Sequence, residues 1–417
     1  MLQLLIVADD FTGGLDTGIQ FGKRGIRTAL VQYEELSPEF LSDCACEVVV
    51  VDTHSRHVPP AEAYRRVINA TRMAKTKGCL YFYKKTDSTL RGNIGSELQA
   101  MLEGCKAERM VFAPAHPALG RTTWEGIQYV KGVPLAQTEF ATDPFNPVTS
   151  SDLRSILAQQ SSLPVWLIPQ NATDNTLRIS ERGIYVADGR EEADYESLAF
   201  RLCRDGSEFC FAGCGGFAGA LAEALPLTRC ESRFTGERGG TLLACGSLHP
   251  MSVKQCHWAE ASGGYQALRL TAEELLTGEI SSETINKMNR IMKQSGKLLL
   301  QGPGGRESLP ETYGIAQRLG IDAPAQAIAA GFGKIVRETA ASVGTLIVFG
   351  GDTLLGIASA LGCRVVHPIA ELLPGVVLSQ LQTAVRSYYL VTKAGGFGSE
   401  RLVGEISAAL RWIQRED

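Results

Sequence analysis

The stretch that decides the fold reads Leu-Ile-Val-Phe-Gly-Gly-Asp-Thr over residues 346–353, an apolar run that ends directly in a glycine turn. Three similar turns follow apolar runs at residues 242–247, 298–305 and 389–398. A parallel α/β sheet places all such turns along one edge, outside the carboxyl ends of its strands. Glycine lets the backbone approach a ligand there, and the following helices direct free N–H groups toward it. The second half of the chain therefore predicts a site for a phosphate chain, as in a nucleotide.

The bulk composition is that of a globular protein with two domains. The chain has 417 residues, 44% of them hydrophobic, and a formal net charge of −4, which argues against nucleic acid as the main partner. No apolar run reaches the roughly 18 residues of a membrane helix, and the apolar start at residues 4–8 lacks the basic leader of a signal peptide. The eleven cysteines show no metal-binding spacing, so we expect reduced thiols and a cytoplasmic protein.

Short strand-like runs alternate with amphipathic stretches through the first half of the chain, which predicts βαβ units and a mostly parallel sheet. The strands are expected at residues 3–8, 28–32, 47–51, 79–83, 109–113, 165–168, 183–186 and 208–212. A polar, glycine-bearing segment at residues 228–240 interrupts the pattern and is expected to link a domain at 1–227 to another at 241–417. The predicted fold class is therefore α/β, with two α/β/α domains whose mostly parallel sheets face each other across a cleft.

Residues 117–151 do not follow this alternation. They contain turn formers such as Gly120 and Pro147 and few periodic apolar residues. A loop of this length inside a compact domain is usually functional. We therefore expect residues 117–151 to form an excursion over the active cleft.

Charged side chains follow the predicted strands of the first domain. Asp9 and Asp10 follow the first strand, Arg56 follows the third, and Lys85 and Asp87 follow the fourth. Arginine and lysine bind carboxylates, and aspartate accepts hydrogen bonds from sugar hydroxyls. Any one of these residues could instead cap a helix. Three charged clusters at neighbouring strand ends favour a joint site for a small, densely hydroxylated anion.

Two other classes of function remain as alternatives. Residues 213–218 approximate a dinucleotide fingerprint, but no acidic strand end follows about 20 residues later, so an ordinary βα turn is favoured over an NAD-dependent dehydrogenase. A binding protein that holds a sugar acid without chemistry would be exported, and the chain shows no signal peptide. His54 and His57 have a spacing that a metal permits, but no third ligand is evident, so the sequence assigns no metal ligands.

Taken together, the motifs resemble the four-carbon acid sugar kinases. The matching segments occur in family order over essentially the whole chain: Ala8–Gly13, Lys84–Asn93, Gly120–Thr122, Gly350–Thr353 and Gly395–Gly398. The resemblance implies an N-terminal α/β domain that binds the acid sugar and a C-terminal α/β domain that binds ATP. The continuation Asp16-Thr17-Gly18 resembles the D-threonate type more than the 3-oxo-tetronate type, while D-erythronate and 4-hydroxythreonine stay open as substrates.

The resemblance also implies individual contacts. The residues implied to contact the sugar acid are Asp10, Arg56, Lys85, Thr86 and Asp87. Those implied to contact ATP are Ser247, Gly350, Gly351, Asp352, Thr353, Gly395, Gly396, Phe397 and Gly398. Ala394 and Leu354 depart from the family pattern, which often has hydroxyl residues at these positions. Backbone N–H groups are therefore expected to replace one or two side-chain contacts to phosphate.

The implied reaction is transfer of the γ-phosphoryl group of ATP to the C4 hydroxyl of a four-carbon sugar acid. Its transition state needs in-line placement and charge neutralisation more than covalent chemistry. Arg56 and Lys85 would hold the carboxylate, and Asp10 would orient hydroxyls. Asp87 or Asp352 would accept the proton while Mg²⁺ bridges the phosphates, and the sequence leaves open which aspartate is the base and which binds Mg²⁺. Exposed edge strands leave a homodimer open.

Overall fold

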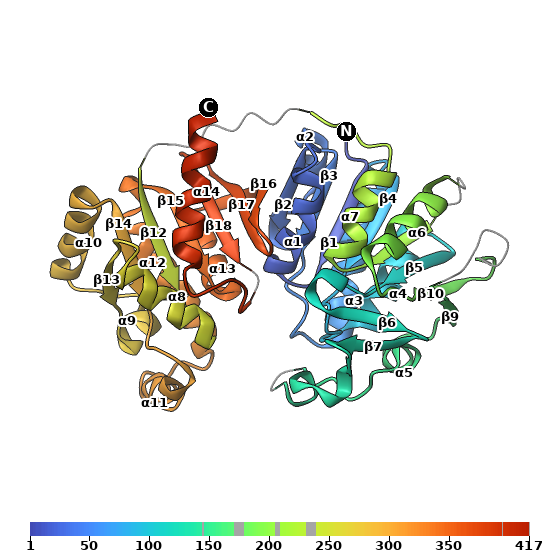
Figure 1. Cartoon of the computed structure of the whole chain (residues 1–417), viewed down its shortest axis with the longest axis horizontal. Coiled ribbons are helices and arrows are strands. Elements are labelled where there is room, and N and C mark those ends of the chain that lie inside the picture. The colour runs from blue at the N-terminus through green and yellow to red at the C-terminus, as the bar shows by residue number, and fades with distance from the viewer. Residues whose placement is uncertain (144–145, 171–178, 205–208, 231–238, 394, 417) are drawn as a thin grey trace. The chain divides into compact units, whose positions relative to one another are not determined.

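The computed structural model describes residues 1–143, 146–170, 179–204, 209–230, 239–393 and 395–416 (Figure 1). The chain divides into two compact units, Met1–Glu231 and Ser232–Asp417, and the predicted linker at 228–240 spans this division. Both units have the predicted α/β architecture with a mostly parallel sheet. Among the described helices, none is long and apolar enough to cross a membrane.

The sheet of the first unit is entirely parallel in its described pairings, with the strand order β2-β3-β1-β4-β11-β5-β10-β9. Its strands are β1 (Leu4–Ala8), β2 (Thr28–Gln32), β3 (Val48–Asp52), β4 (Tyr81–Lys85), β5 (Arg109–Ala113), β9 (Val165–Ile168), β10 (Gly183–Ala187) and β11 (Phe209–Gly213). All eight predicted strands are confirmed to within about two residues at their ends. β1 and β3 are buried at every position, as expected for strands covered by helices on both faces; β1 is apolar throughout, whereas β3 ends in the buried Asp52.

Helices connect these strands and pack on the sheet. They are α1 (Phe11–Gly22), α2 (Pro38–Asp43), α3 (Pro60–Thr76), α4 (Ile94–Cys105), α5 (Leu153–Ala158), α6 (Glu192–Arg204) and α7 (Gly215–Ala224). α1 packs beside α7, and α3 packs beside α4. α1 follows β1 and α7 follows β11, so both helices begin at the carboxyl edge of the sheet.

The segment at residues 117–151 has more structure than the irregular excursion that we expected. It contains a small antiparallel sheet, β6 (Arg121–Trp124), β7 (Ile127–Val130) and β8 (Val133–Pro134). Glu125 and Gly126 join β6 to β7 with φ values of 51° and 75°, which is the left-handed backbone of a two-residue hairpin turn. The turn formers in this segment thus close hairpins as well as forming loops.

The second unit has the strand order β13-β14-β12-β15-β18-β17-β16. Its strands are β12 (Gly240–Cys245), β13 (Gln266–Arg269), β14 (Lys297–Gln301), β15 (Val343–Phe349), β16 (Cys363–Leu373), β17 (Val376–Thr383) and β18 (Ser387–Lys393). Its helices are α8 (Pro250–Ala261), α9 (Ala272–Thr277), α10 (Ser282–Gln294), α11 (Leu309–Arg318), α12 (Pro324–Arg337), α13 (Gly351–Ala360) and α14 (Leu402–Glu416). β12, β14, β15 and β18 run parallel and precede the four glycine turns, whereas β17 is antiparallel to both of its neighbours.

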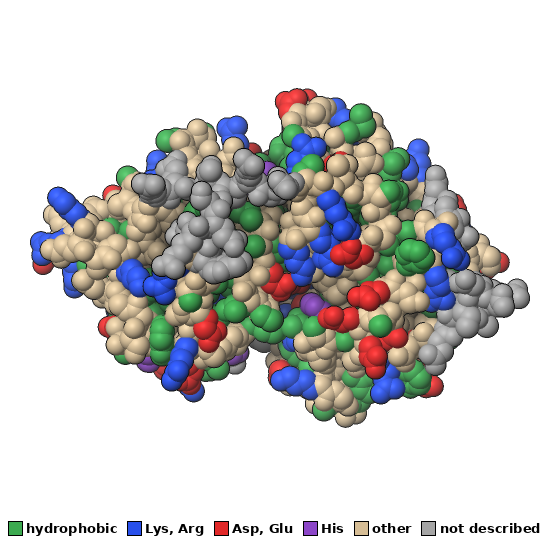
Figure 2. All heavy atoms as spheres, turned by 45° about the horizontal axis from the view of Figure 1, so that its top comes forward, with side chains coloured by type: hydrophobic (Ala, Val, Ile, Leu, Met, Phe, Trp, Pro, Cys, Tyr) green, Lys and Arg blue, Asp and Glu red, His purple; other side chains and the backbone are tan. Residues whose placement is uncertain are grey.

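The surface carries both signs of charge. On the face shown in Figure 2, acidic and basic side chains are interspersed, and hydrophobic side chains appear as scattered groups.

Candidate active site

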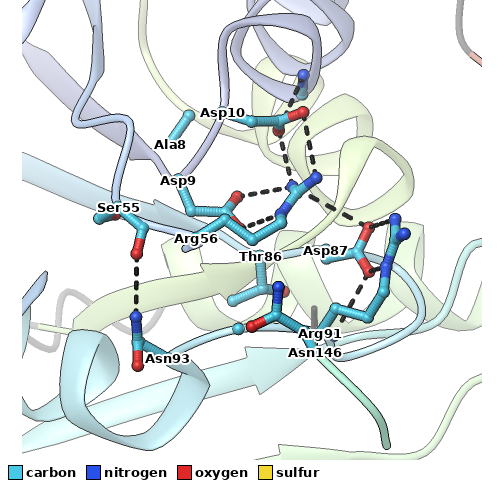
Figure 3. Close-up of polar contacts among 12 residues, drawn as sticks. Ala8, Asp9, Asp10, Ser55, Arg56, Thr86, Asp87, Arg91, Asn93 and Asn146 are labelled. Atoms are coloured by element: carbon cyan, nitrogen blue, oxygen red, sulfur yellow. Dashed lines mark hydrogen bonds and ion pairs between the residues drawn. The ribbon is translucent and has the colours of Figure 1, made fainter. Parts of the chain in front are cut away.

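Three neighbouring strand ends bring charged side chains together in the first unit (Figure 3). β1 lies between β3 and β4, and Ala8 aligns with Asp52 on one side and with Lys85 on the other. Residues that follow these strands therefore meet at one edge of the sheet. We call this set the charged edge, and it consists of Asp9, Asp10, Arg56, Lys85, Asp87 and Arg91.

Arg56 lies at the centre of the charged edge and pairs with two carboxylates. Its Nε and Nη2 donate to Asp9 Oδ2 and Oδ1 at 2.7 and 3.1 Å. Its Nη2 and Nη1 donate to Asp10 Oδ1 and Oδ2 at 2.8 and 3.2 Å. Asp87 Oδ1 lies a further 4.0 Å from Nη2. Charge-assisted pairs of this bidentate kind are strong and fix the orientation of both partners. Arg56 therefore holds the acids of the charged edge in place.

Asp87 is held by a second arginine that the sequence-based site omitted. Arg91 Nε and Nη2 donate to Asp87 Oδ2 and Oδ1 at 2.7 and 3.2 Å, and Thr89 Oγ1 donates to Oδ2 at 2.5 Å. Burial alone would raise the pKa of Asp87, but Arg56, Arg91 and these hydrogen bonds hold it well below its usual range. Asp87 is therefore a carboxylate at every physiological pH.

Asp10 is the most open acid of the charged edge. Its side chain is 29% exposed, against 1% for Asp9 and 12% for Asp87. Asp10 also caps α1, because its Oδ1 accepts a hydrogen bond of 3.1 Å from the Gly13 amide. Asp10 thus caps a helix and also belongs to the charged edge, so the two interpretations of this residue do not exclude each other. Asp10 is therefore the acid of the charged edge that is most accessible from outside the protein.

A buried ion pair supports the charged edge from beneath. Lys84 Nζ lies 3.0 Å from Glu97 Oε2, and both side chains are at most 1% exposed. The Ser55 hydroxyl donates to Glu97, and Asn93 Nδ2 donates to the Ser55 carbonyl at 2.9 Å (Figure 3). Burial raises the pKa of Glu97, while Lys84 opposes that rise. These contacts fix the loop that carries Arg56, because Ser55 is its neighbour in sequence.

Thr86 differs from the other predicted contact residues. Its amide and hydroxyl both donate to the Gly213 carbonyl, at 2.8 and 3.3 Å, so the residue ties β4 to β11. Its side chain is completely buried. Sequence reasoning placed Asp9, Asp10, Arg56, Lys85 and Asp87 at neighbouring strand ends, as the structure has them, but it did not list Asp9 among the contacts to the sugar acid and did not name Arg91 at all. Both lay within motifs already singled out, and Arg91 is four residues after Asp87.

A pocket in the second unit gathers three of the four glycine turns. It is bordered by the turn after β12, the turn after β14 and the start of α13, with α11 and α12 forming an apolar wall. Its lining includes Ser247, Gly302, Gly304, Asp352, Thr353, Ile328 and Phe332. Gly350 follows β15 with a φ of 121° and is the N-cap residue of α13, which therefore has no side-chain cap. The free N–H groups at the start of α13 are thus placed beside the pocket, as an anionic phosphate requires.

Glycine is required at two positions of this pocket. A Cβ at Gly246 would overlap the Thr353 hydroxyl, and one at Gly350 would lie 3.0 Å from the same oxygen. Asp352 is exposed in the first turn of α13. Mg²⁺ is usually bound by one or two carboxylates together with water molecules and substrate phosphates. The Asp352 carboxylate fits this type of site. Among the described residues, no group of three or more His, Cys, Asp or Glu forms a complete metal site.

The fourth glycine turn is attached to α8 and is absent from the described pocket lining. Gln255 Nε2 donates to the carbonyls of Phe397 and Ser399, each at 2.9 Å. Lys393 Nζ donates to Ser252 Oγ at 3.0 Å and to the Gly395 carbonyl, while burial lowers the pKa of Lys393 to about 8. The predicted contacts of this turn with ATP stay predictions.

The two departures from the family pattern have different outcomes. Leu354 is 1% exposed and belongs to the core of the second unit, so a phosphate contact from its side chain is not available. Ala394 lies outside the described residues. The donors that α13 offers to a phosphate are therefore its first backbone N–H groups and the hydroxyl of Thr353, which also lines the pocket.

Comparisons with known proteins match both units. A family model for a sugar-binding N-terminal domain matches residues 4–221, and one for a nucleotide-binding C-terminal domain matches residues 242–403. The chain is 30% identical to a D-threonate kinase of Salmonella typhimurium over 96% of each chain. It is 28% identical to a D-erythronate kinase of Heliobacterium modesticaldum, over 98% of this chain and 96% of the relative.

A solved structure supports the fold. A Salmonella typhimurium protein described as a putative tRNA synthase superimposes with a TM-score of 0.79, covering 97% of this chain and 99% of that one. The two sequences are 24% identical, so this likeness concerns the fold alone.

Proposed function

The chain belongs to the four-carbon acid sugar kinases, and from this premise we propose that it transfers the γ-phosphoryl group of ATP to the C4 hydroxyl of a four-carbon sugar acid, with D-threonate as the favoured substrate. The D-threonate kinase at 30% identity supports this choice, as does the Asp16-Thr17-Gly18 continuation of the first motif. The first unit is proposed to bind the acid and the second to bind ATP.

The observation that carries the proposal is the set of three carboxylates fixed around Arg56. Asp9, Asp10 and Asp87 all lie within 4.0 Å of its guanidinium. An array of fixed acceptors is suited to hydroxyl groups, because each carboxylate oxygen accepts a hydrogen bond in a set direction. A small polyol is therefore the ligand class that this edge of the sheet fits best.

We propose that Asp87 is the base that accepts the proton of the C4 hydroxyl. Its Oδ2 accepts hydrogen bonds from Thr89 and from Arg91, whereas Oδ1 accepts one described hydrogen bond, from Arg91 Nη2. Oδ1 is thus the oxygen with capacity for a substrate hydroxyl. As the C4 oxygen bonds to the γ-phosphorus and the bond to ADP breaks, the hydroxyl proton passes to this oxygen. The lowered pKa makes Asp87 a weak base, which suits a loose transition state in which the proton leaves late.

Asp352 is then assigned to the metal. Mg²⁺ neutralises phosphate charge when it is bound, and Asp352 would hold it together with water molecules. Free N–H groups in the first turn of α13 are proposed to hold the phosphates themselves.

A phosphorylation assay tests the function. The purified protein would be incubated with ATP, Mg²⁺ and, separately, D-threonate, D-erythronate, 4-hydroxythreonine and a 3-oxo-tetronate. ADP formation with one of these acids, together with a phosphate ester of that acid by mass spectrometry, is the expected result. Reduction of NAD by the same panel would indicate a dehydrogenase instead. Binding of an acid without either reaction would indicate a binding protein.

A further inference from the structure

We propose, on the basis of the proposed function, that Gln301 recognises the base of the nucleotide, and that its Oε1 accepts a hydrogen bond from the exocyclic amino group of adenine. Gln301 is the last residue of β14 and lines the pocket of the second unit. The groups assigned to ATP in the proposed function hold its phosphates and Mg²⁺ and do not contact the base. The inference therefore adds a residue that determines which phosphoryl donor is bound.

The first argument is an acceptor that the fold leaves without a donor. Gln301 is 5% exposed, and its side-chain Oε1 is buried and accepts no hydrogen bond from the described residues. The main chain of the same residue is paired, because its carbonyl accepts a hydrogen bond of 2.9 Å from the Leu270 amide. A buried polar atom without a partner is costly, so an atom of this kind at a pocket fits a ligand that brings a donor.

Other buried oxygens of the second unit do not share this position. Gln255 and Ser379 also carry a side-chain oxygen without a partner among the described residues, but neither lines the pocket. Gln255 has a structural role, since its Nε2 donates to the carbonyls of Phe397 and Ser399. Among the described residues that have such an oxygen, Gln301 is thus the one that borders the pocket.

The place of Gln301 in the sheet suits the base rather than the phosphates. In register, Gln301 aligns with Cys245 of β12, and Cys245 aligns with Phe349 of β15. Gly350 and α13, where the phosphates are proposed to bind, directly follow Phe349. Gln301 therefore lies two strands away from this helix start, roughly 10 Å across the sheet. An extended nucleotide spans such a distance between its phosphates and its base.

The surroundings of Gln301 are suited to an aromatic ring. A Cβ at the adjacent Gly302 would lie 3.1 Å from Leu275 Cδ1 and 3.6 Å from Phe332 Cζ. Tyr313 also lines the pocket and is 50% exposed, so its ring can stack on a bound base. A base has apolar faces and a polar edge, and ligand pockets combine apolar walls with a few placed polar groups. One carboxamide within an apolar wall therefore fits the polar edge of a base.

An acceptor requires a base that carries a donor. The exocyclic amino group of adenine is such a donor. A site built to hydrogen-bond one group of a ligand rejects the analogue that lacks this group, because the buried protein atom then stays unpaired. The preference for the amino group is therefore the property by which Gln301 can be tested.

The test uses Gln301→Met, which replaces the carboxamide by an apolar side chain of similar length. The two nucleotides are ATP and purine riboside triphosphate, which lacks only the amino group, and calorimetry with Mg²⁺ and without a sugar acid measures their binding. For the wild type, we expect ATP to bind about ten- to a hundredfold more tightly than the analogue, since the analogue leaves a buried acceptor unpaired. Gln301→Met should weaken ATP binding by a similar factor and bind the two nucleotides with nearly equal affinity.

Thermal unfolding and a control variant separate recognition of the base from folding. Without nucleotide, the Tm of Gln301→Met should equal or exceed that of the wild type, because an unpaired buried acceptor is removed. Ser379→Ala is the matched control, because it removes another such oxygen in β17, away from the described pocket lining. Ser379→Ala should leave the preference for ATP over the analogue unchanged.

Retention of this preference by Gln301→Met would overturn the inference, and so would equal binding of the two nucleotides by the wild type. A variant that keeps the preference but no longer discriminates against 2′-deoxy-ATP would place the ribose at Gln301 and would also overturn it. The binding measurements need no phosphoryl transfer. The expected preference would therefore support the inference even if every sugar acid failed as a substrate, whereas transfer with unchanged selectivity in Gln301→Met would uphold the proposed function alone.

Discussion

The charged edge of the first unit and the pocket of the second unit differ in the chemical groups that form them. At the charged edge, two arginines orient three carboxylates through distances of 2.7–4.0 Å. In the pocket, the glycine turns and the uncapped start of α13 expose main-chain N–H groups, and the hydroxyls of Ser247 and Thr353 accompany them. A phosphate chain needs many equivalent donors, whereas recognition of a sugar acid depends on a separate contact with each of its substituents. The contrast predicts that side-chain changes act most strongly in the first unit.

Asp87→Asn is expected to have the largest effect. The substitution keeps the shape but removes the charge that Arg56 and Arg91 orient and the oxygen that takes the proton. Turnover should fall by a hundredfold or more, within the range of about 10²–10⁴ for general acid–base groups. Steady-state kinetics at saturating ATP and acid would measure it, with circular dichroism as the control for folding. A decrease of less than tenfold would remove Asp87 from this role.

Gly350→Ala tests the pocket. At φ 121° an alanine is strained, and its Cβ would lie 3.0 Å from Thr353 Oγ1. A backbone shift costing about 1–2 kcal/mol should weaken ATP binding roughly tenfold and leave acid binding unchanged. Gly362→Ala is the matched control, because Gly362 also has a positive φ, 68°, but nothing lies within 4 Å of its Cβ. Equal ATP affinities of the two variants by calorimetry would contradict the assignment.

Asp52→Asn should give the smallest effect, on stability alone. Burial raises the pKa of Asp52 to about 8, with Asp10 and Asp9 adding to the rise and the His54 amide opposing it. Between about pH 4 and pH 8 the folded state therefore binds the extra proton, and stability falls as pH rises. Asparagine removes this dependence, so its advantage in Tm over the wild type should grow by several degrees from about pH 5.5 to pH 8. Parallel curves for the two proteins would show that Asp52 is ionised in the fold.

The sequence predicted structure best at positions where a residue type has a single physical role, such as apolar residues in a buried strand or glycine in a turn. Buried five-residue runs such as Leu4–Ala8 could be recognised as strands, and glycine turns marked their carboxyl ends. The β16–β17 hairpin was missed, because the glycine turns indicated parallel strands and said nothing of residues 363–383. The partners of Arg56 and Lys85 could not be predicted either. Both were assigned to the carboxylate, and only distances show that Arg56 pairs with two acids, whereas no carboxylate among the described residues lies within 4.0 Å of Lys85 Nζ.

The crowding of Gly246 and Gly350 around the Thr353 hydroxyl has an evolutionary consequence. A backbone N–H group is present whatever the side chain of its residue. Side chains around the pocket can therefore change during evolution without removing these donors, provided that the glycines are retained. Acceptor preference depends instead on a few side chains at rigid strand ends. A mutational library confined to those few codons would be the economical way to redirect this scaffold to a new sugar acid.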